Sequence, residues 1–479
     1  MMNKPVNERE IVLGILMEIT ENGTFSHVIL REVLGKYQYL PRRERAFITR
    51  VTEGTLEHLI EIDYILDHVS KVKVKKMKAV IRNILRMSVY QLKFMDSVPD
   101  RAVCSEAVKL AGRKGFINLK GFVNGVLRNV ARQMDEIPYP EDPTAALSVR
   151  YSCPEWIIRY WQKTWSGDVI EKILEDFQRE KPLTVRCCLD RTTPERLKEQ
   201  FAREGVRAET HPYLPYALCI SGFDHLEALE SFREGMFAVQ DISSMLAGEI
   251  ADPRKDDFVI DVCAAPGGKA LHVAEKLALA GGGRVQARDI SERKVELIRE
   301  NIRRLSGAAG AENPAMPGNV AVDAVCMDAA VLDEASVGKA DLVIADLPCS
   351  GLGVLGKKPD LKYRVTQESV EELAQLQREI LTCAREYVKP GGVLLYSTCT
   401  ISLVENMDNV HWFLEQFPEF APDPIGERLC PELRDSVQEE GCIQLLPGVH
   451  KCDGFFIARL KKKAEAGKEE GTCSGKTEK

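Results

Sequence analysis

The sequence predicts a multidomain chain, in which an all-helical region and a small α+β module precede an α/β domain built on a parallel sheet. Three observations carry this prediction. The chain has 479 residues, which is more than a single domain usually contains, because one hydrophobic core stops growing at ~250–300 residues. Apolar residues recur at helical spacing up to about residue 135. From about residue 236, short apolar runs alternate with helical stretches, which is typical of parallel strands with helices on both faces.

Residues 1–140 form the predicted helical domain. Apolar repeats at helical spacing include Val12, Ile15, Leu16 and Ile19, and later Phe122, Val126 and Val130. Basic residues gather in the same region, as Lys71, Lys73, Lys75, Lys76, Lys78, Arg82 and Arg86, and as Arg113, Lys114, Lys120, Arg128 and Arg132. Because the whole chain carries a net charge of -7, this local excess favours an RNA-facing domain over a merely solvated face.

Prolines at 138, 140 and 143 mark a linker, and residues 145–235 follow as the α+β module. Its predicted helices cover 154–180 and 195–204, and its strand-like runs cover 183–186 and 217–220.

The third domain covers residues 236–462. Its predicted strands lie at 258–262, 283–287, 320–322, 342–344 and 393–396, and its helices at 269–280, 292–306 and 367–388. Two late strands, 441–445 and 455–460, are expected to close the sheet. We expect a loop at 306–319 and a disordered charged tail at 463–479.

The totals describe an ordinary globular protein, with 44% hydrophobic and 29% charged residues. The sequence has neither an apolar run of the ~20 residues that a membrane helix needs nor a signal-peptide core. A cytoplasmic location is therefore expected, where the 14 cysteines stay reduced. Cys442, His450 and Cys452 lie close together, but no metal site is predicted from them.

Two cysteines follow predicted strands. Cys349 comes after the 342–344 run, within Asp346-Leu347-Pro348-Cys349, and Cys399 comes after the 393–396 run. Open α/β sheets bind their ligands beyond the carboxyl ends of the strands, so two thiols there suggest nucleophilic chemistry. The alternative is that both are ordinary buried cysteines.

A cofactor site is predicted after the strand at 258–262. Glycines at a strand-to-helix turn allow close approach of a ligand, and the next helix's N-terminus favours an anion. A P-loop is excluded because Cys263 and Ala270 stand where it requires Gly and Ser or Thr, and the three glycines of a dinucleotide fingerprint are missing. Asp289 could grip ribose hydroxyls and Asp328 an adenine, although an acid after a strand is often only a helix cap. S-adenosylmethionine fits, with these candidate contacts: Cys263, Ala264, Ala265, Pro266, Gly267, Gly268, Lys269, Asp289, Asp328 and Asp346.

Four stretches, 261–269, 346–353, 397–400 and 453–456, resemble the RNA 5-methylcytosine methyltransferases. Residues 8–135 resemble the NusB-like domain that begins the bacterial small-subunit ribosomal RNA methyltransferase B family, in pieces such as 84–87, 90–92, 106–108 and 122–128. The middle module is similar to the RNA-binding segment of that family and ends in Gln240-Asp241-Ile242-Ser243-Ser244. The chain departs from the family where Cys187 or Cys188 replaces a common Asn, Ala270 a Thr, and Gly356 an Arg, and the last is expected to weaken a contact to the RNA backbone.

The resemblance implies a Rossmann-like, S-adenosylmethionine-dependent domain that methylates C5 of a cytosine in small-subunit (16S) ribosomal RNA through a covalent adduct. It makes Cys399 the nucleophile that attacks C6, Cys349 the thiol that assists product release, and Asp346 the group that hydrogen-bonds the base. Lys269 would lower a thiol pKa or hold Asp346. The implied partner is free or early-assembly ribosomal RNA, bound by a monomer.

Two other functions compete with this interpretation. A non-catalytic RNA-binding or antitermination module would suit the NusB-like part, but intact Cys349 and Cys399 argue against it. Amino-group methylation would require Asn or Asp followed by Pro-Pro and an aromatic residue from position 346 onward, where Leu347 and Cys349 stand instead.

Overall fold

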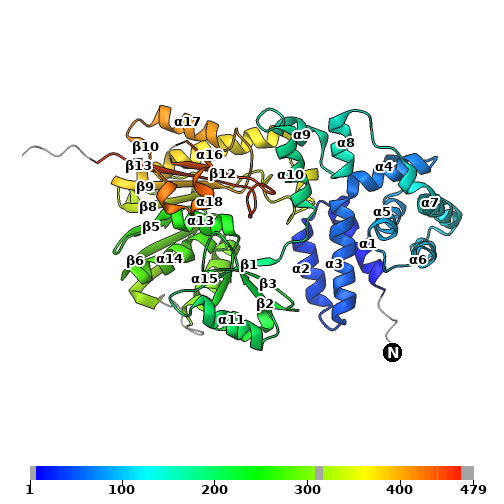
Figure 1. Ribbon diagram of the computed structural model, residues 1–479, viewed down its shortest axis with the longest axis horizontal. Helices are drawn as coiled ribbons and strands as arrows, with labels where there is room; N and C mark the ends of the chain where they lie inside the picture. The colour runs from blue at the N-terminus through cyan, green and yellow to red at the C-terminus, as the bar shows by residue number, and fades with distance from the viewer. Residues whose placement is uncertain (1–6, 308–316, 440, 465–479) are drawn as a thin grey trace, which may run out of the picture.

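The helical N-terminal region and the strand-rich remainder form two halves that lie side by side (Figure 1). The computed structural model describes residues 7–307, 317–439 and 441–464. Among the helices of these ranges, none is long and apolar enough to cross a membrane. The expected disordered tail, apart from residues 463 and 464, and the centre of the expected 306–319 loop fall outside the described residues.

The N-terminal half is all-helical, as predicted. Its helices are α1 (Glu8–Thr20), α2 (Ser26–Lys36), α3 (Arg42–Glu57), α4 (Leu59–Val69), α5 (Ala79–Phe94), α6 (Asp100–Arg113) and α7 (Lys120–Gln133). The apolar residues that recur at helical spacing along α1, α5 and α7 are buried in one shared core, which includes Val12, Leu16, Ile84 and Val130. Burial of these repeats explains why the sequence pattern located the helices.

The middle module begins with α8 (Pro143–Arg150), α9 (Glu155–Trp161) and α10 (Gly167–Phe177). The prediction of one helix over 154–180 was wrong, because Ser166 has an extended backbone and begins α10 as its N-cap. An antiparallel sheet in the order β2-β3-β1-β4 follows, formed by β1 (Leu183–Cys187), β2 (Arg207–Thr210), β3 (Ala217–Ser221) and β4 (Phe237–Val239), together with α11 (Pro194–Arg203) and α12 (Glu230–Arg233). The sequence missed β2, which is mostly exposed, and β4, which has three residues.

The third domain holds a nine-stranded sheet in the order β11-β12-β13-β9-β8-β5-β6-β7, with β10 paired to β13. Its strands are β5 (Phe258–Asp261), β6 (Gly283–Asp289), β7 (Val320–Cys326), β8 (Ala340–Asp346), β9 (Val388–Thr398), β10 (Phe420–Pro422), β11 (Val437–Glu439), β12 (Cys442–Leu445) and β13 (Phe455–Lys462). Its helices are α13 (Ile242–Ala251), α14 (Gly268–Ala280), α15 (Glu292–Ser306), α16 (Gln367–Tyr387), α17 (Met407–Gln416) and α18 (Pro431–Arg434).

Strand direction in this sheet sets the place of the site. The five predicted strands, β5 to β9, are parallel, whereas β13, β12 and β11 continue the sheet antiparallel beyond β9. The late strands therefore extend the sheet and do not close it, because β13 has β9 on one side and β12 on the other. The chain runs outward from β5 to β7 in one direction and from β8 to β9 in the other. The crevice for a ligand is thus expected where β5 and β8 meet.

The long loop between β8 and α16 connects the two halves. Lys362 donates from Nζ to Glu57 O at 2.8 Å, and the Tyr363 hydroxyl donates to Leu56 O at 2.8 Å. The middle module is held by a buried ion pair between Arg186 and Glu275, a residue of α14. The helical half therefore contacts the loop that follows β8, and the middle module contacts the helix that follows β5.

Candidate functional site

Cys349 and Cys399 meet at the carboxyl ends of the neighbouring strands β8 and β9. Their Sγ atoms lie 3.3 Å apart, close enough for a thiol of one to donate a hydrogen bond to the other. Asp346 and Ser397 are register partners, so the segments that leave the two strands start side by side. Gly353 N donates to Cys399 O at 3.1 Å, which joins the loop after Cys349 to the other cysteine's backbone. The two predicted thiols therefore belong to one site.

The two thiols have opposite acidities. The hydrogen bond from Cys349 lowers the pKa of Cys399 below its usual value, against the effect of burial. The same hydrogen bond, and then burial, raise the pKa of Cys349 well above its usual value. Because the thiolate is the nucleophilic form of cysteine, this geometry favours Cys399 as the attacking group and leaves Cys349 as a proton donor.

Lys269 and Asp346 form an ion pair beside the thiols. Lys269 Nζ lies 2.7 Å from Asp346 Oδ2, and the Ser397 hydroxyl donates to Asp346 Oδ1 at 2.8 Å. Burial acts to lower the pKa of Lys269, but the charge and hydrogen bond of Asp346 outweigh it and raise the pKa. Lys269 Nζ also lies 5.0 Å from the ring centroid of Phe455. Of its two predicted roles, Lys269 is placed to hold Asp346, and its charge also helps to lower the pKa of Cys399.

A buried acid, Glu405, holds the loops that carry the two cysteines. It was not identified from the sequence. Its side chain is fully buried, and its carboxylate accepts from Ser350 N at 2.8 Å and from Gln377 Nε2 at 3.1 Å. The Ser350 hydroxyl also lies 2.8 Å from that of Thr400. Ser350 follows Cys349 and Thr400 follows Cys399, so this network holds the backbone next to both thiols. In the sequence, a single Glu just before a helix cannot be distinguished from a solvent-exposed Glu, because no motif or spacing marks it as buried.

The loop 262–267 connects β5 to α14 and folds back on itself. Gly267 N donates to Ala264 O at 2.7 Å, and Gly267 has φ +105°, which an L side chain rarely adopts. Ala265 N donates to Asp289 Oδ2 at 3.3 Å, so the acid after β6 holds this loop directly. Asp289 also accepts from Ser291 N at 3.4 Å, but Ser291 itself is the N-cap of α15, so Asp289 is not the cap of that helix. The predicted contacts on this loop and Asp289 are therefore brought together.

Two more acids lie at neighbouring strand ends. Asp328 follows β7 and is exposed, and Met327 N donates to Asp289 O at 3.0 Å, which places Asp328 beside the β6 end. Asp261 ends β5 and is buried, and its Oδ2 has no hydrogen-bond partner among the described residues. Burial, followed by the charge of Asp346, raises the pKa of Asp261 to about 7. An orphaned buried carboxylate oxygen of this kind is costly unless a ligand satisfies it.

Gly356 stands where the backbone approaches α10. A Cβ at this position would lie 2.9 Å from Phe177 O, so a side chain would require the loop or the helix to shift. The next residue, Lys357, lies 2.7 Å from Asp241 Oδ2 and 2.6 Å from Asp453 Oδ2. The departure at Gly356 thus has a packing reason, and Lys357 ties the end of the middle module to the catalytic loops.

The basic residues of the helical half fall into two groups. In the first, Arg86 makes a two-pronged contact with Asp63, at 2.8 and 2.6 Å, and Arg82 lies 2.6 Å from Glu21. These two arginines are thus used within the domain, whereas the lysines of the group (Lys71, Lys73, Lys75, Lys76 and Lys78) are exposed.

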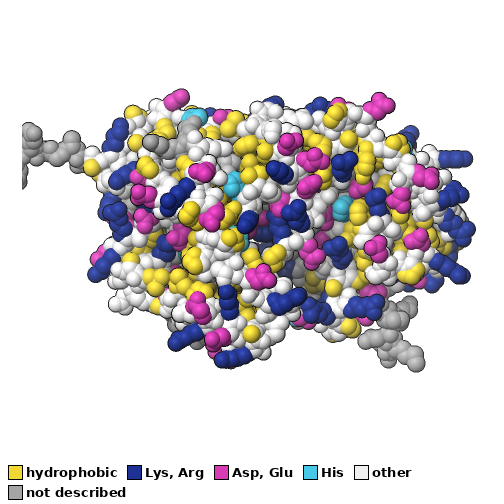
Figure 2. All heavy atoms as spheres, in the orientation of Figure 1, with side chains coloured by type: hydrophobic (Ala, Val, Ile, Leu, Met, Phe, Trp, Pro, Cys, Tyr) yellow, Lys and Arg dark blue, Asp and Glu magenta, His cyan; other side chains and the backbone are white. Residues whose placement is uncertain are grey.

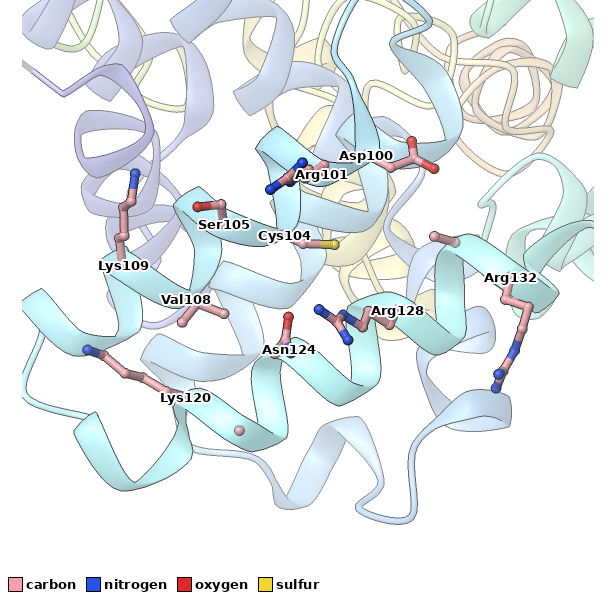
Figure 3. Close-up of a pocket in the computed structure, with 12 residues that line it drawn as sticks. Asp100, Arg101, Cys104, Ser105, Val108, Lys109, Lys120, Asn124, Arg128 and Arg132 are labelled. Carbon is pink, nitrogen blue, oxygen red and sulfur yellow. The ribbon is translucent and has the colours of Figure 1, made fainter.

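Three members of the second group, Lys120, Arg128 and Arg132, line a groove of about 750 Å³ between α6 and α7. Figure 3 shows Arg101, Cys104, Asn124 and Arg128 converging on it from the two helices. Its lining includes five cations (Arg101, Lys109, Lys120, Arg128 and Arg132) and a single acid, Asp100. Figure 2 shows Lys and Arg side chains gathered at this end of the molecule. The charge suits a polyanion.

Comparison with known proteins identifies each part of the chain. Residues 249–461 match the family model "16S rRNA methyltransferase RsmB/F", residues 6–132 match the "NusB family", and residues 153–225 match the "Methyltr_RsmF/B-like, ferredoxin-like domain". The matched methyltransferase model includes both cysteines and argues against a purely non-catalytic module.

Relatives of the same length support this result. The Probable ribosomal RNA small subunit methyltransferase B of Bacillus subtilis (strain 168) is 34% identical, covering 96% of this chain and 100% of that protein. The Ribosomal RNA small subunit methyltransferase B of Cronobacter sakazakii is 28% identical over 96% of this chain and 100% of its own length.

Solved structures agree in fold. The crystal structure of PH0851 is 26% identical and has a TM-score of 0.78, covering 96% of this chain and 100% of that one. NSun6 from Pyrococcus horikoshii with SFG, at 23% identity and a TM-score of 0.54, shares the fold over 64% of this chain and 98% of its own. With its NusB-like helical domain, its ferredoxin-like module and its methyltransferase domain in this order, the chain belongs to the ribosomal RNA small subunit methyltransferase B family.

Proposed function

We propose that this protein transfers a methyl group from S-adenosylmethionine to C5 of a cytosine in 16S ribosomal RNA, through a covalent bond between Cys399 and C6. The observation that carries the proposal is the pair of thiols, 3.3 Å apart, whose pKa values are shifted in opposite directions. C5 of cytosine is a poor nucleophile. Addition of a thiolate to C6 makes C5 enamine-like, which is what methylation at that carbon requires.

The chain's own residues divide the steps. The Cys399 thiolate forms the bond to C6, while Asp346, held by Lys269, hydrogen-bonds the base and stabilises the charge that develops on it. Bound S-adenosylmethionine would supply the electrophilic methyl group that C5 takes. Product release then removes the proton from C5, and the electron pair of that bond re-forms the ring double bond as the bond from Cys399 to C6 breaks.

The coupled thiols suggest how Cys349 assists release. Its high pKa arises first from its hydrogen bond to Cys399. Once Cys399 sulfur is bonded to carbon, that sulfur no longer holds a negative charge, so the pKa of Cys349 should fall. A larger fraction of Cys349 is then thiolate, the form that can accept the C5 proton, whereas at the stage that needs the Cys399 thiolate Cys349 is the thiol that donates a hydrogen bond to it.

The strand ends also fit S-adenosylmethionine. Asp261 has an unpartnered carboxylate oxygen that suits the ammonium group, Asp289 suits the ribose hydroxyls and Asp328 the adenine amino group. The methyltransferase family supports this donor, and NSun6 with SFG, an analogue of S-adenosylmethionine, is a related fold. We further propose that the helical domain adds RNA affinity through its exposed lysines and the groove between α6 and α7, as the NusB family match suggests.

The test is a denaturing gel after incubation with 16S ribosomal RNA and S-adenosylmethionine. Cys399→Ala should give neither adduct nor 5-methylcytosine, because C5 is never activated. Cys349→Ala should still attack and methylate, but should accumulate as a slowly migrating protein–RNA band, because elimination is impaired. Cys383→Ala, which removes a partly buried thiol of α16, is the matched control and should turn over normally.

Two other gel patterns are informative. A band with Cys399→Ala and none with Cys349→Ala would exchange the two roles. Full turnover by both variants would remove the thiols from the mechanism and return them to ordinary core cysteines.

A further inference from the structure

The start of α2, in the helical half, lies against the loop that follows Cys349. Ser26 donates to the carboxylate of Asp360 from its backbone N, at 3.1 Å, and from its hydroxyl. Arg364 donates to Gly23 O and to Thr24 O, at 2.5 Å each. Asp360 and Ser26 are both buried, so the junction is firm. Residues from opposite halves of the chain thus share one surface.

Two aromatic side chains of α2 and its N-cap are exposed at this junction. Phe25 is 45% exposed, and its ring centroid lies 5.8 Å from that of His27, which is also exposed. The Arg364 guanidinium carbon lies 4.3 Å from the centroid of the Phe25 ring. Phe usually lies in the interior, so a half-exposed ring next to the buried Ser26, which is bonded to Asp360, is an apolar surface held in place among polar groups.

Positive charge accompanies these rings. Lys358 is exposed on the same loop, five residues after Gly353, whose N donates to Cys399 O. Burial and then Lys358 lower the pKa of His27, and Lys358 also contributes to the lowered pKa of Cys399, so its charge acts on both places. The nearby acid, Asp360, is buried and already engaged by Ser26 and Arg364. Figure 2 shows the molecule hollowed where the two halves meet, with Lys and Arg side chains around the hollow.

We propose that Phe25, His27 and Lys358 form a contact surface for the single-stranded RNA that flanks the target base. Phe25 and His27 stack on nucleobases, and Lys358 pairs with a phosphate. Aromatic rings beside a cation are the usual means of holding unpaired nucleotides, because every base has a π-face and every linkage a negative charge. The inference rests on the proposed function only in taking RNA as the substrate. It makes the helical half part of the surface that holds the RNA beside the cysteine loops.

The test measures binding of a short single-stranded RNA without S-adenosylmethionine, by fluorescence anisotropy at several salt concentrations. Phe25→Ala and His27→Ala should each weaken binding roughly tenfold, with an unchanged salt dependence, because a stacking contact is lost and no charge is removed. Lys358→Gln should weaken binding and make the slope of log K against log salt less steep by about 0.7, the value for one phosphate contact on a single strand.

Controls separate stacking from damage to the junction. Phe25→Tyr keeps a ring and should restore the affinity lost in Phe25→Ala. Tyr39→Ala removes an aromatic side chain that is 70% exposed, whose ring neighbour is Tyr37, and should bind as the wild type does. His27 has no hydrogen bond to the loop among the described residues, so His27→Ala should keep the thermal unfolding midpoint.

The result that overturns the proposal is wild-type affinity in Phe25→Ala and His27→Ala with both proteins folded. Equal losses in Tyr39→Ala would also overturn it, because the effect would not be local. This binding assay needs no methyl transfer, so its outcome does not depend on the gel assay for the cysteines. Either proposal can fail while the other holds.

Discussion

The strand ends that carry Cys349 and Cys399 differ from the helical domain in how their charged side chains are placed. At the strand ends, Lys269 is paired with Asp346, and Glu405 is buried among donors from Ser350 and Gln377. In the helical half, the lysines near residue 75 and the cations of the groove between α6 and α7 lie at the surface. The first region holds its charged groups in buried contacts, whereas the second presents most of these cations to solvent.

The difference teaches which changes should matter. A charge held in a buried network acts through position, so its removal should affect folding and chemistry together. A surface charge acts on a polyanion through counterion release, so its loss should be graded and sensitive to salt. The following four changes test this contrast, from the largest expected effect to the smallest.

Glu405→Ala should give the largest effect. It leaves Ser350 N without its buried acceptor and removes one of the two acceptors of Gln377 Nε2, which also donates to Pro348 O. A hydrogen bond to a charged group contributes ~1.5–3 kcal/mol. We expect a loss of about 3 kcal/mol in the free energy of urea unfolding, together with loss of the covalent adduct. Glu405→Gln, which keeps one acceptor oxygen, should lose less of both. Wild-type stability in Glu405→Ala would show that the network does not hold the cysteine loops.

Asp289→Ala should weaken S-adenosylmethionine binding. A charged hydrogen bond of ~1.5–3 kcal/mol corresponds to roughly 10- to 100-fold in Kd, measured by calorimetry. Because Asp289 also accepts from Ala265 N, part of the loss would come from a loosened cofactor loop. Asp323→Ala, which removes an exposed acid of β7, is the matched control. Equal affinity in Asp289→Ala would remove this acid from the site.

Reversal of Lys73, Lys75 and Lys76 to Glu should weaken RNA binding without change in the adduct chemistry at saturating RNA. Loss of three phosphate contacts on a single strand makes the salt slope less steep by about 2. Reversal of Lys198 of α11, a partly buried lysine outside the helical domain, is a control for charge reversal away from this surface. An unchanged slope would mean that the lysines form only a solvated face and that the groove between α6 and α7 carries the affinity.

The pH dependence of alkylation should show the coupling of the two thiols. A free cysteine has a pKa of about 8.5. The pKa of Cys399 is lowered, so the thiolate of Cys399 should form, and react with iodoacetamide, at a lower pH than a free cysteine does. Cys349→Ala removes the donor that is the first cause of the shift, so the midpoint should move to higher pH. Peptide mass spectrometry assigns the label to Cys399. An unchanged midpoint would show that Cys349 does not lower the pKa of Cys399.

Much of the fold and part of the site followed from local pattern. Strands such as β5 and β8 are continuous apolar runs because both faces of a parallel sheet are buried, and that signal is strong. The helix over 154–180 was wrong because periodicity continues across Ser166, where backbone geometry interrupts it. The exposed β2 was missed because it has no buried face to record in the sequence.

The sequence by itself determined the order of the three parts, the parallel strands and the side chains that follow each strand, because these depend on spacing along the chain. The domain limits at 140, 145, 235 and 462, and the roles of the individual site residues, stay predictions. Only the tertiary structure decided that Cys349 and Cys399 lie 3.3 Å apart, that Glu405 holds their loops and that Phe25 of the helical half borders the Cys349 loop. Such distances between residues remote in sequence depend on packing of whole elements, and no local pattern encodes them.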